Sequence, residues 1–113
     1  MKTIVITGAS DGIGAELARQ LAQQHRQEAA LVLAARNQDL LLQVAEQCRP
    51  LGSEVLVVPT DVSDPAQCRD LIARSVAQFG RLDALVNNAG VSAQALFEDV
   101  QADDLGWYEN LMR

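Results

Sequence analysis

The stretch from residue 7 to residue 14, TGASDGIG, has residue types that suit contact with an anion. It follows an apolar β-branched run and precedes a helical pattern, so it is predicted to turn from a strand into a helix. Gly8 permits a sharp turn, Gly12 lets the backbone approach a ligand without a Cβ in the way, and Gly14 lets the helix pack close to the strand. The free N–H groups and the dipole of such a helix favour a diphosphate.

Other polar residues follow the remaining apolar runs. Arg36 and Asn37 follow ALVLAA, Asp61 and Val62 come soon after EVLVVP, and DALVNN leads into Gly90. If these runs are parallel strands, their carboxyl ends lie at one edge of a sheet, where ligands of open α/β sheets bind. The hydroxyls of Thr7 and Ser10 can either bind such a ligand or shape the turn.

A regular alternation of strands and helices positions these segments. Apolar runs predict strands at 3–7, 30–35, 54–59 and 83–88, and periodic apolar residues predict helices between them and a last helix from near Asp103. Asn37 and Asp64 are predicted N-caps, and Gly80 is predicted to end the third helix. Alternating elements imply parallel pairing, and continuous apolar strands imply helices on both faces. We therefore expect an α/β fold, a Rossmann-type doubly wound parallel sheet with strand order 3-2-1-4.

The expected helix faces follow from the spacing of large apolar residues. Right-handed crossovers place the third helix on the opposite face of the sheet from the first two. Cys48 and Cys68 then lie on opposite faces, so we expect buried, reduced thiols and no disulfide. The expected faces are Ile13, Leu17 and Leu21 in the first helix; Leu40, Leu41, Val44, Ala45 and Cys48 in the second; and Cys68, Leu71, Ile72, Val76 and Phe79 in the third.

Length and charge narrow the classes of function. The 113 residues suffice for one domain, and 15 acidic against 9 basic side chains give a net charge of −6. That sign opposes nucleic acid and anionic membrane surfaces, although a helix N-terminus and one arginine can still bind a phosphate locally. No run reaches transmembrane length and MKTIVITG is too short for a signal peptide, so a cytoplasmic protein is expected. We expect no metal site.

Taken together, the motifs carry a family resemblance. TGASDGIG with the spacing T-G-x-x-x-G-x-G, DV at 61–62 and NNAG at 87–90 follow one another at suitable intervals. In these motifs the sequence resembles the short-chain dehydrogenase/reductase family, in the branch that uses a catalytic tyrosine and lysine. The resemblance covers essentially the whole chain. It implies that a dinucleotide cofactor contacts three groups of residues: Gly8, Ser10, Gly12, Ile13 and Gly14 at the diphosphate and ribose; Asp61 and Val62 at the adenine; and Asn88, Ala89 and Gly90 at the ribose on the nicotinamide side.

The end of the second strand bears on the choice of cofactor. Ala35 stands where NAD-preferring members of the family carry an acid that holds the ribose hydroxyls. Arg36 follows directly, and a guanidinium suits a 2′-phosphate. We therefore predict NADP(H) over NAD(H), with a solvated strand-end charge as the alternative for Arg36. Asp11 departs from the pattern, because NADP-binding relatives often carry a base just before Gly12.

The family's catalytic Y-x-x-x-K motif is absent from these residues. Tyr108 is followed four residues later by Met112, the one lysine is Lys2, and Asn110 aligns poorly with the catalytic asparagine. We therefore expect residues 1–113 to be the N-terminal dinucleotide-binding part of a single domain whose catalytic C-terminal part is absent, and to be inactive alone. The resemblance implies that the parent transfers hydride between nicotinamide and a carbonyl or alcohol substrate, with oligomerisation of the parent left open.

Two other functions stay open. A non-catalytic dinucleotide sensor or regulatory module would share the same binding motifs, and a Y-x-x-x-K motif after Arg113 would distinguish the enzyme from it. A nucleotide-sugar epimerase is disfavoured by the glycine spacing, which such relatives usually shorten.

Overall fold

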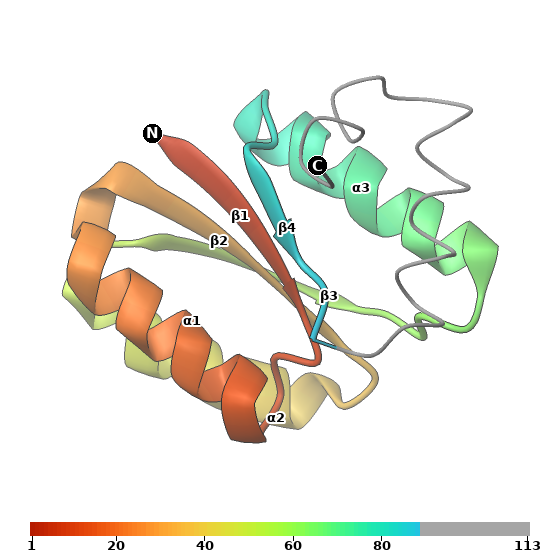
Figure 1. Ribbon diagram of the computed structural model, residues 1–113, viewed down its shortest axis with the longest axis horizontal. Coiled ribbons are helices and arrows are strands. Elements are labelled where there is room, and N and C mark those ends of the chain that lie inside the picture. The colour runs from red at the N-terminus through yellow and green to blue at the C-terminus, as the bar shows by residue number, and fades with distance from the viewer. Residues whose placement is uncertain (89–113) are drawn as a thin grey trace.

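The computed structural model describes residues 1–88, which form one parallel sheet with helices on both faces (Figure 1). The strand order β3-β2-β1-β4 confirms the predicted doubly wound α/β fold. The strands are β1 (Lys2–Thr7), β2 (Ala29–Ala35), β3 (Glu54–Pro59) and β4 (Ala84–Val86). The helices are α1 (Gly12–His25), α2 (Gln38–Cys48) and α3 (Pro65–Phe79), with short 3-10 turns η1 (Arg26–Glu28) and η2 (Arg49–Leu51).

The strand register brings the carboxyl ends of three strands level. Thr7 at the end of β1 pairs with Ala34 on β2, and Ala35 at the end of β2 pairs with Pro59 at the end of β3. The strands end at Thr7, Ala35 and Pro59, and the chain leaves the sheet after each of these three residues. Because the strands are parallel, the three turns therefore gather at one edge of the sheet.

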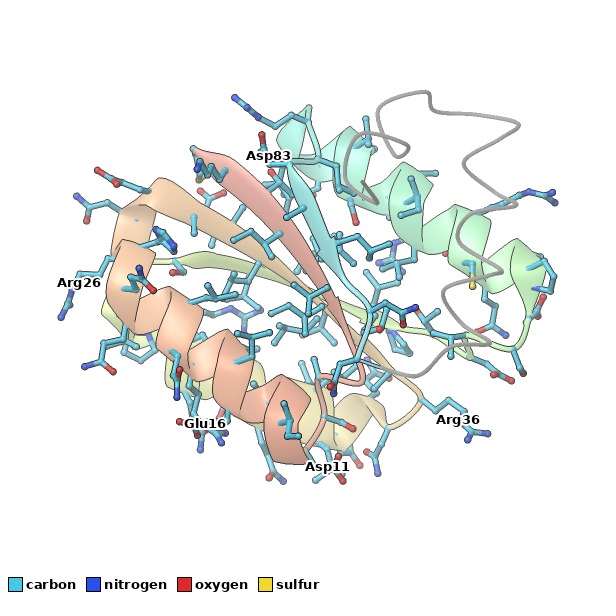
Figure 2. All side chains as sticks on the ribbon, in the orientation of Figure 1. Asp11, Glu16, Arg26, Arg36 and Asp83 are labelled. Carbon is cyan, nitrogen blue, oxygen red and sulfur yellow. The ribbon has the colours of Figure 1, made fainter. Side chains whose placement is uncertain are left out.

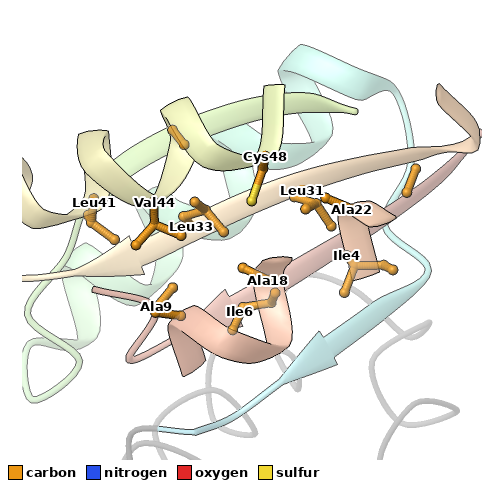
Figure 3. Packing of buried hydrophobic residues seen from close by; sticks show 13 residues of the cluster. Ile4, Ile6, Ala9, Ala18, Ala22, Leu31, Leu33, Leu41, Val44 and Cys48 are labelled. Atoms are coloured by element: carbon orange, nitrogen blue, oxygen red, sulfur yellow. The ribbon is translucent and has the colours of Figure 1, made fainter. Parts of the chain in front are cut away.

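Each face of the sheet has its own apolar core. Ile4 and Ile6 pack in the cluster that contains the buried residues of α1 and α2 (Figure 3), whereas Val5 packs in the cluster that contains those of α3. Cys48 belongs to the first cluster and Cys68 to the second, and both thiols are free and buried. The predicted placement of α3 opposite α1 and α2 is confirmed, as is the absence of a bond between these cysteines.

The predicted face of α1 is confirmed only in part, because Leu21 packs against the core while half-buried but Ile13 does not. Ile13 is 78% exposed, and the fully or nearly fully buried side chains of α1 are Ala15, Ala18 and Ala22 (Figure 3 shows the last two against Ile4 and Ile6). Small side chains let the helix axis lie close to the sheet, so the alanines are the fully buried residues of this contact and Leu21 packs against the same core while half-buried. Gly14 is needed for the same close approach between α1 and β1, because a Cβ at this position would lie 2.1 Å from the carbonyl oxygen of Gly8.

The other two helices follow the predictions with two exceptions. The Asn37 side chain accepts a hydrogen bond from Leu40 N at 3.1 Å and Asp64 accepts one from Ala66 N at 3.0 Å, which confirms both N-caps. Leu40 is only half-buried and faces the edge where the turns gather. On α3 the last buried residue is Ser75, whereas the predicted Val76 is only half-buried. Ser75 can be buried because its hydroxyl donates a hydrogen bond to the Leu71 carbonyl at 2.7 Å.

Several predicted features fall outside the described residues: the helix from near Asp103, Ala89, Gly90, Tyr108 and Asn110. The fourth strand, predicted over 83–88, covers Ala84–Val86. Among the helices of residues 1–88, none is both long and apolar enough to cross a membrane.

Candidate functional site

A cavity of about 540 Å³ lies where the turns after β1, β2 and β3 gather. It brings together five of the residues predicted to contact a cofactor: Gly8, Ser10, Arg36, Asp61 and Val62. Its remaining lining residues are Asp11, Ala35, Asn37, Leu40, Thr60 and Ser63. The predicted residues Gly12, Ile13, Gly14 and Asn88 do not line this cavity, although the first three lie in the same β1–α1 segment.

The turn between β1 and α1 leaves backbone surface accessible. Gly8 and Gly12 have φ angles of 64° and 57°, a left-handed conformation that glycine adopts without steric cost. A Cβ on Gly12 would meet nothing within 4 Å, so the space beside this residue is open. Asp11 stands at the N-cap of α1, but its side chain makes no capping hydrogen bond. The N-terminus of α1 therefore presents N–H groups that no side chain at the N-cap satisfies, as an anion site requires.

Thr7 connects this turn to the end of β4. Its buried hydroxyl accepts a hydrogen bond from Asn88 N at 3.0 Å and lies 3.2 Å from Asn87 Oδ1 and 3.4 Å from the Val86 carbonyl, either of which can accept its proton. The Asn88 side-chain amide in turn donates to the Gly8 carbonyl at 3.4 Å. Of the two roles that the sequence left open for Thr7, the structure supports shaping the turn.

Arg36 extends outward from the end of β2, at the same end of the sheet as Asp11 (Figure 2). It is exposed, and within residues 1–88 no hydrogen bond or ion pair engages its guanidinium group. Asp11 and Asp61 are the acidic residues that share the cavity lining with Arg36. The cavity therefore combines one uncommitted guanidinium with two carboxylates.

Asp61 is held by Ser63, two residues further along the chain. Asp61 Oδ1 accepts hydrogen bonds from the Ser63 hydroxyl at 2.6 Å and from Ser63 N at 3.0 Å. These two hydrogen bonds, together with the charge of Arg36, hold the pKa of Asp61 below its usual value despite some burial. Asp61 is therefore an ionised acceptor at neutral pH.

Residues that sequence reasoning missed include Leu40, Thr60 and Ser63. Leu40 and Val62 give the cavity apolar lining, and Thr60 N donates to the Ala35 carbonyl at 2.8 Å, which fixes the start of the third turn against β2. Nothing in the sequence marked Leu40 as a cavity residue, because it also fits the apolar spacing of α2. Thr60 and Ser63 could have been found from the sequence, because they flank the DV motif at 61–62 that was predicted to contact the cofactor.

The two cysteines of the described residues are not activated as nucleophiles. Burial raises the pKa of the Cys68 thiol to about 11, with Asp64 and Asp61 adding to the effect, and burial also raises the pKa of Cys48. Both thiols are therefore protonated at neutral pH. No group of three or more His, Cys, Asp or Glu side chains within residues 1–88 is placed to hold a metal ion.

The chain is similar to curated dehydrogenases over most of its length. The 11-beta-hydroxysteroid dehydrogenase A of Sesamum indicum is 47% identical over 111 residues, which cover 97% of this chain and 31% of that protein. The protein of the same name from Arachis hypogaea is 50% identical over 99 residues, covering 87% of this chain and 28% of its own length. The chain thus spans about a third of the length of these relatives.

Solved structures share the fold. A short-chain type dehydrogenase/reductase from Mycobacterium marinum has a TM-score of 0.80 at 27% identity, over 90% of this chain and 49% of its own. The L-sorbose reductase of Gluconobacter frateurii, solved with NADPH and L-sorbose, has a TM-score of 0.76 at 31% identity, over 92% of this chain and 47% of its own. An alcohol dehydrogenase from Thermococcus sibiricus, complexed with 5-hydroxy-NADP, has a TM-score of 0.69 at 38% identity, over 75% of this chain and 35% of its own.

The family itself follows from the sequence as a whole. A model of the short chain dehydrogenase family matches residues 2–112, which contain the glycine turn, the Asp61 turn and the Asn88 segment described above. With this match and the shared parallel sheet, the chain belongs to the short-chain dehydrogenase family of oxidoreductases.

Proposed function

We propose that this chain is the cofactor-binding part of an NADP(H)-dependent oxidoreductase that transfers hydride between nicotinamide and a small carbonyl or alcohol substrate. The observation that carries the proposal is the sequence Ala35-Arg36 at the end of β2, on the wall of the cavity. Ala35 has no carboxylate to accept hydrogen bonds from two ribose hydroxyls or to repel a 2′-phosphate. Arg36 offers a guanidinium group, which pairs well with phosphate.

The chemistry of the site fits a dinucleotide with an extra phosphate. The open space beside Gly12 and the free start of α1 suit the diphosphate. Gly8, Ser10 and Gly14 would line the diphosphate and ribose from the same turn. Arg36 would hold the 2′-phosphate. The similar Gluconobacter and Thermococcus structures are complexes with NADPH and 5-hydroxy-NADP, which supports the choice of cofactor.

The remaining assignments divide between the two ends of the cofactor. Asp61 would accept a hydrogen bond from the adenine amino group, with Val62 beside the ring, because both lie on the cavity wall away from β4. Ile13 and Asn88 lie outside the cavity. Ile13 would contact the diphosphate and its ribose with the rest of the β1–α1 turn, and Asn88 would contact the ribose on the nicotinamide side. Ala89 and Gly90, which fall outside the described residues, are assigned to the same ribose. When bound, the cofactor supplies or takes up the hydride.

In the proposed oxidoreductase, this chain binds the cofactor, and the catalytic groups come from a part of the protein outside residues 1–113. Because the chain spans about a third of its curated relatives, we assign no catalytic residue among residues 1–113. We propose that these residues form the amino-terminal part of a single cytoplasmic domain.

Direct titration of the full-length protein with NADPH and NADH tests the proposal. Quenching of protein fluorescence or calorimetry gives both dissociation constants. We expect NADPH to bind at least about tenfold more tightly, the effect of one good charge-assisted hydrogen bond. Equal affinities would reject the NADP(H) preference, and binding of neither would reject the dinucleotide site.

A further inference from the structure

The two oxygens of the Asp61 carboxylate have different environments. Oδ1 accepts both hydrogen bonds from Ser63, from its hydroxyl at 2.6 Å and from its N–H at 3.0 Å. Within residues 1–88, no group donates a hydrogen bond to Oδ2. Asp61 lines the cavity, so one oxygen is committed to the loop and the other is available to a ligand.

The backbone around Asp61 is held from two further directions. Asp61 N donates to Gln67 Oε1 at 2.7 Å, and Asp64 N donates to the Asp61 carbonyl at 3.0 Å. The Gln67 amide also donates to Asp64 Oδ2 at 3.2 Å, which connects the loop to the first turn of α3. The main chain is therefore fixed, and the remaining freedom of the Asp61 carboxylate lies in its side-chain torsions.

The Ser63 hydroxyl limits that freedom. The hydrogen bond from Ser63 N alone would close the local turn, so the hydroxyl is a second restraint on the same oxygen. An O–H donor at 2.6 Å from an ionised carboxylate is in the range of charge-assisted hydrogen bonds. Restraining a binding group before the ligand arrives lowers the entropy lost on binding.

We propose that Ser63 is a positioning residue for the adenine of the cofactor, acting through Asp61. Its hydroxyl holds Oδ1 so that Oδ2 accepts a hydrogen bond from the 6-amino group of the base. This inference rests on the proposed function, since it concerns the same site. It also predicts selection of a 6-aminopurine over a 6-oxopurine, because the oxo group has no proton to donate and would face the carboxylate with a lone pair.

The test compares NADPH with its reduced hypoxanthine analogue, which carries an oxygen at position 6. Dissociation constants are measured for the full-length wild-type protein, Ser63→Ala and Ser63→Thr. We expect Ser63→Ala to weaken NADPH about three- to tenfold, the range for loss of one hydrogen bond, and to change binding of the analogue less than about twofold. Ser63→Thr keeps the hydroxyl and should restore NADPH binding.

Ser53→Ala is the matched control. Its hydroxyl donates to the Arg26 carbonyl at 2.6 Å, outside the cavity, so the substitution removes a similar hydrogen bond and should leave both affinities unchanged. Thermal unfolding of each variant checks that the protein is folded. Equal weakening of NADPH and the analogue by Ser63→Ala, or no weakening of either, would overturn the inference.

A double-mutant cycle tests whether Ser63 acts through Asp61. In an Asp61→Ala background, Ser63→Ala should cause no further loss of NADPH affinity, because the group that it positions is gone. A loss as large as in the wild-type background would show direct contact or a general effect and overturn the inference. Failure of the wild-type protein to bind NADPH would instead overturn the proposed function, so the two failures are distinguishable.

Discussion

The backbone N–H of Asn88 donates to the hydroxyl of Thr7 at 3.0 Å, across 81 residues of sequence. The contact joins the end of β1, where the glycine turn begins, to the segment that follows β4. It lies at the point where the strand order reverses, since β1 has β2 on one side and β4 on the other. The Thr7 hydroxyl therefore connects the two segments of the candidate site, alongside the hydrogen bond from the Asn88 side chain to the Gly8 carbonyl.

Replacing Thr7 tests this connection. Thr7→Val keeps the volume but leaves Asn88 N without its acceptor, so we expect the free energy of unfolding to fall by about 1–3 kcal/mol. Urea denaturation measures the change. Thr3→Val is the matched control on the same strand: Thr3 is fully buried and its Oγ1 has no hydrogen-bond partner within residues 1–88, so its removal should be neutral or stabilising. Equal losses of stability in Thr7→Val and Thr3→Val would show that the hydrogen bond between Thr7 and Asn88 does not stabilise the protein.

The glycines of the β1–α1 turn should separate folding from binding. At Gly14 an alanine Cβ would lie 2.1 Å from the Gly8 carbonyl oxygen, so Gly14→Ala should destabilise the protein by several kcal/mol or prevent folding. At Gly12 the Cβ would meet nothing within 4 Å, and the positive φ costs about 1–2 kcal/mol. Gly12→Ala should therefore fold, with a lowered melting temperature, and lose cofactor affinity because the Cβ occupies the ligand's space. Similar melting temperatures for the two variants would refute this distinction.

Backbone rules made most of the fold predictable. Strand order, parallel pairing and the side on which α3 lies depend on the alternation of elements and the handedness of crossovers, which are insensitive to the identity of single side chains. The caps at Asn37 and Asp64 are local, because a side chain there needs only the next turn of chain as its partner. These features were confirmed for that reason.

Side-chain packing was less predictable. The apolar pattern of α1 pointed to its large residues, but its buried side chains are Ala15, Ala18 and Ala22 because the helix lies close to the sheet. Leu40 was assigned to the core, yet it lines the cavity. The hydrogen bonds between Ser63 and Asp61 depend on the exact path of a turn, which residue spacing does not determine.

Arg36 should decide the preference between the two cofactors. Arg36→Ala removes the guanidinium group from the cavity wall, and we expect NADPH affinity to fall about ten- to a hundredfold while NADH affinity changes less than about twofold. The loss should also shrink at high salt, because part of the attraction between exposed charges is screened. Equal losses for the two cofactors would show that Arg36 does not contact the 2′-phosphate.

Asp11 should oppose the same phosphate. It lines the cavity with Arg36, and a carboxylate near a bound phosphate is unfavourable by about 1 kcal/mol in a solvated site. Asp11→Asn should therefore tighten NADPH by about fivefold and NADH by less, because both cofactors carry the diphosphate but only NADPH carries the 2′-phosphate; titration of both cofactors would reveal the difference. Stability should hardly change, because the Asp11 side chain makes no capping hydrogen bond to α1. Weaker NADPH binding in this variant would indicate that Asp11 itself holds the cofactor.

Asp83 should make stability depend on pH. It lies at the end of the sheet remote from the cavity (Figure 2), where its Oδ2 accepts hydrogen bonds from Thr3 N at 2.8 Å and from Arg81 Nε at 2.9 Å. Burial acts to raise the pKa of Asp83, but these two hydrogen bonds and the charges of Arg81 and Lys2 outweigh it and hold the pKa below its usual value.

The sign of the effect follows from that lowered pKa. The stabilisation by Asp83 is fully present above the pKa of the unfolded carboxyl, about 4, and is lost as the pH falls through the lower pKa of the folded state. Asp83→Asn should therefore reduce the free energy of unfolding at pH 7 and differ progressively less from wild type below about pH 4, as urea denaturation across this range would show. Glu16→Gln is the control, since Glu16 pairs with Arg19 on an exposed helix surface and such pairs contribute little. A difference between Asp83→Asn and wild type that is constant from pH 7 to pH 3 would mean that Asp83 stabilises the sheet through its shape and not its charge.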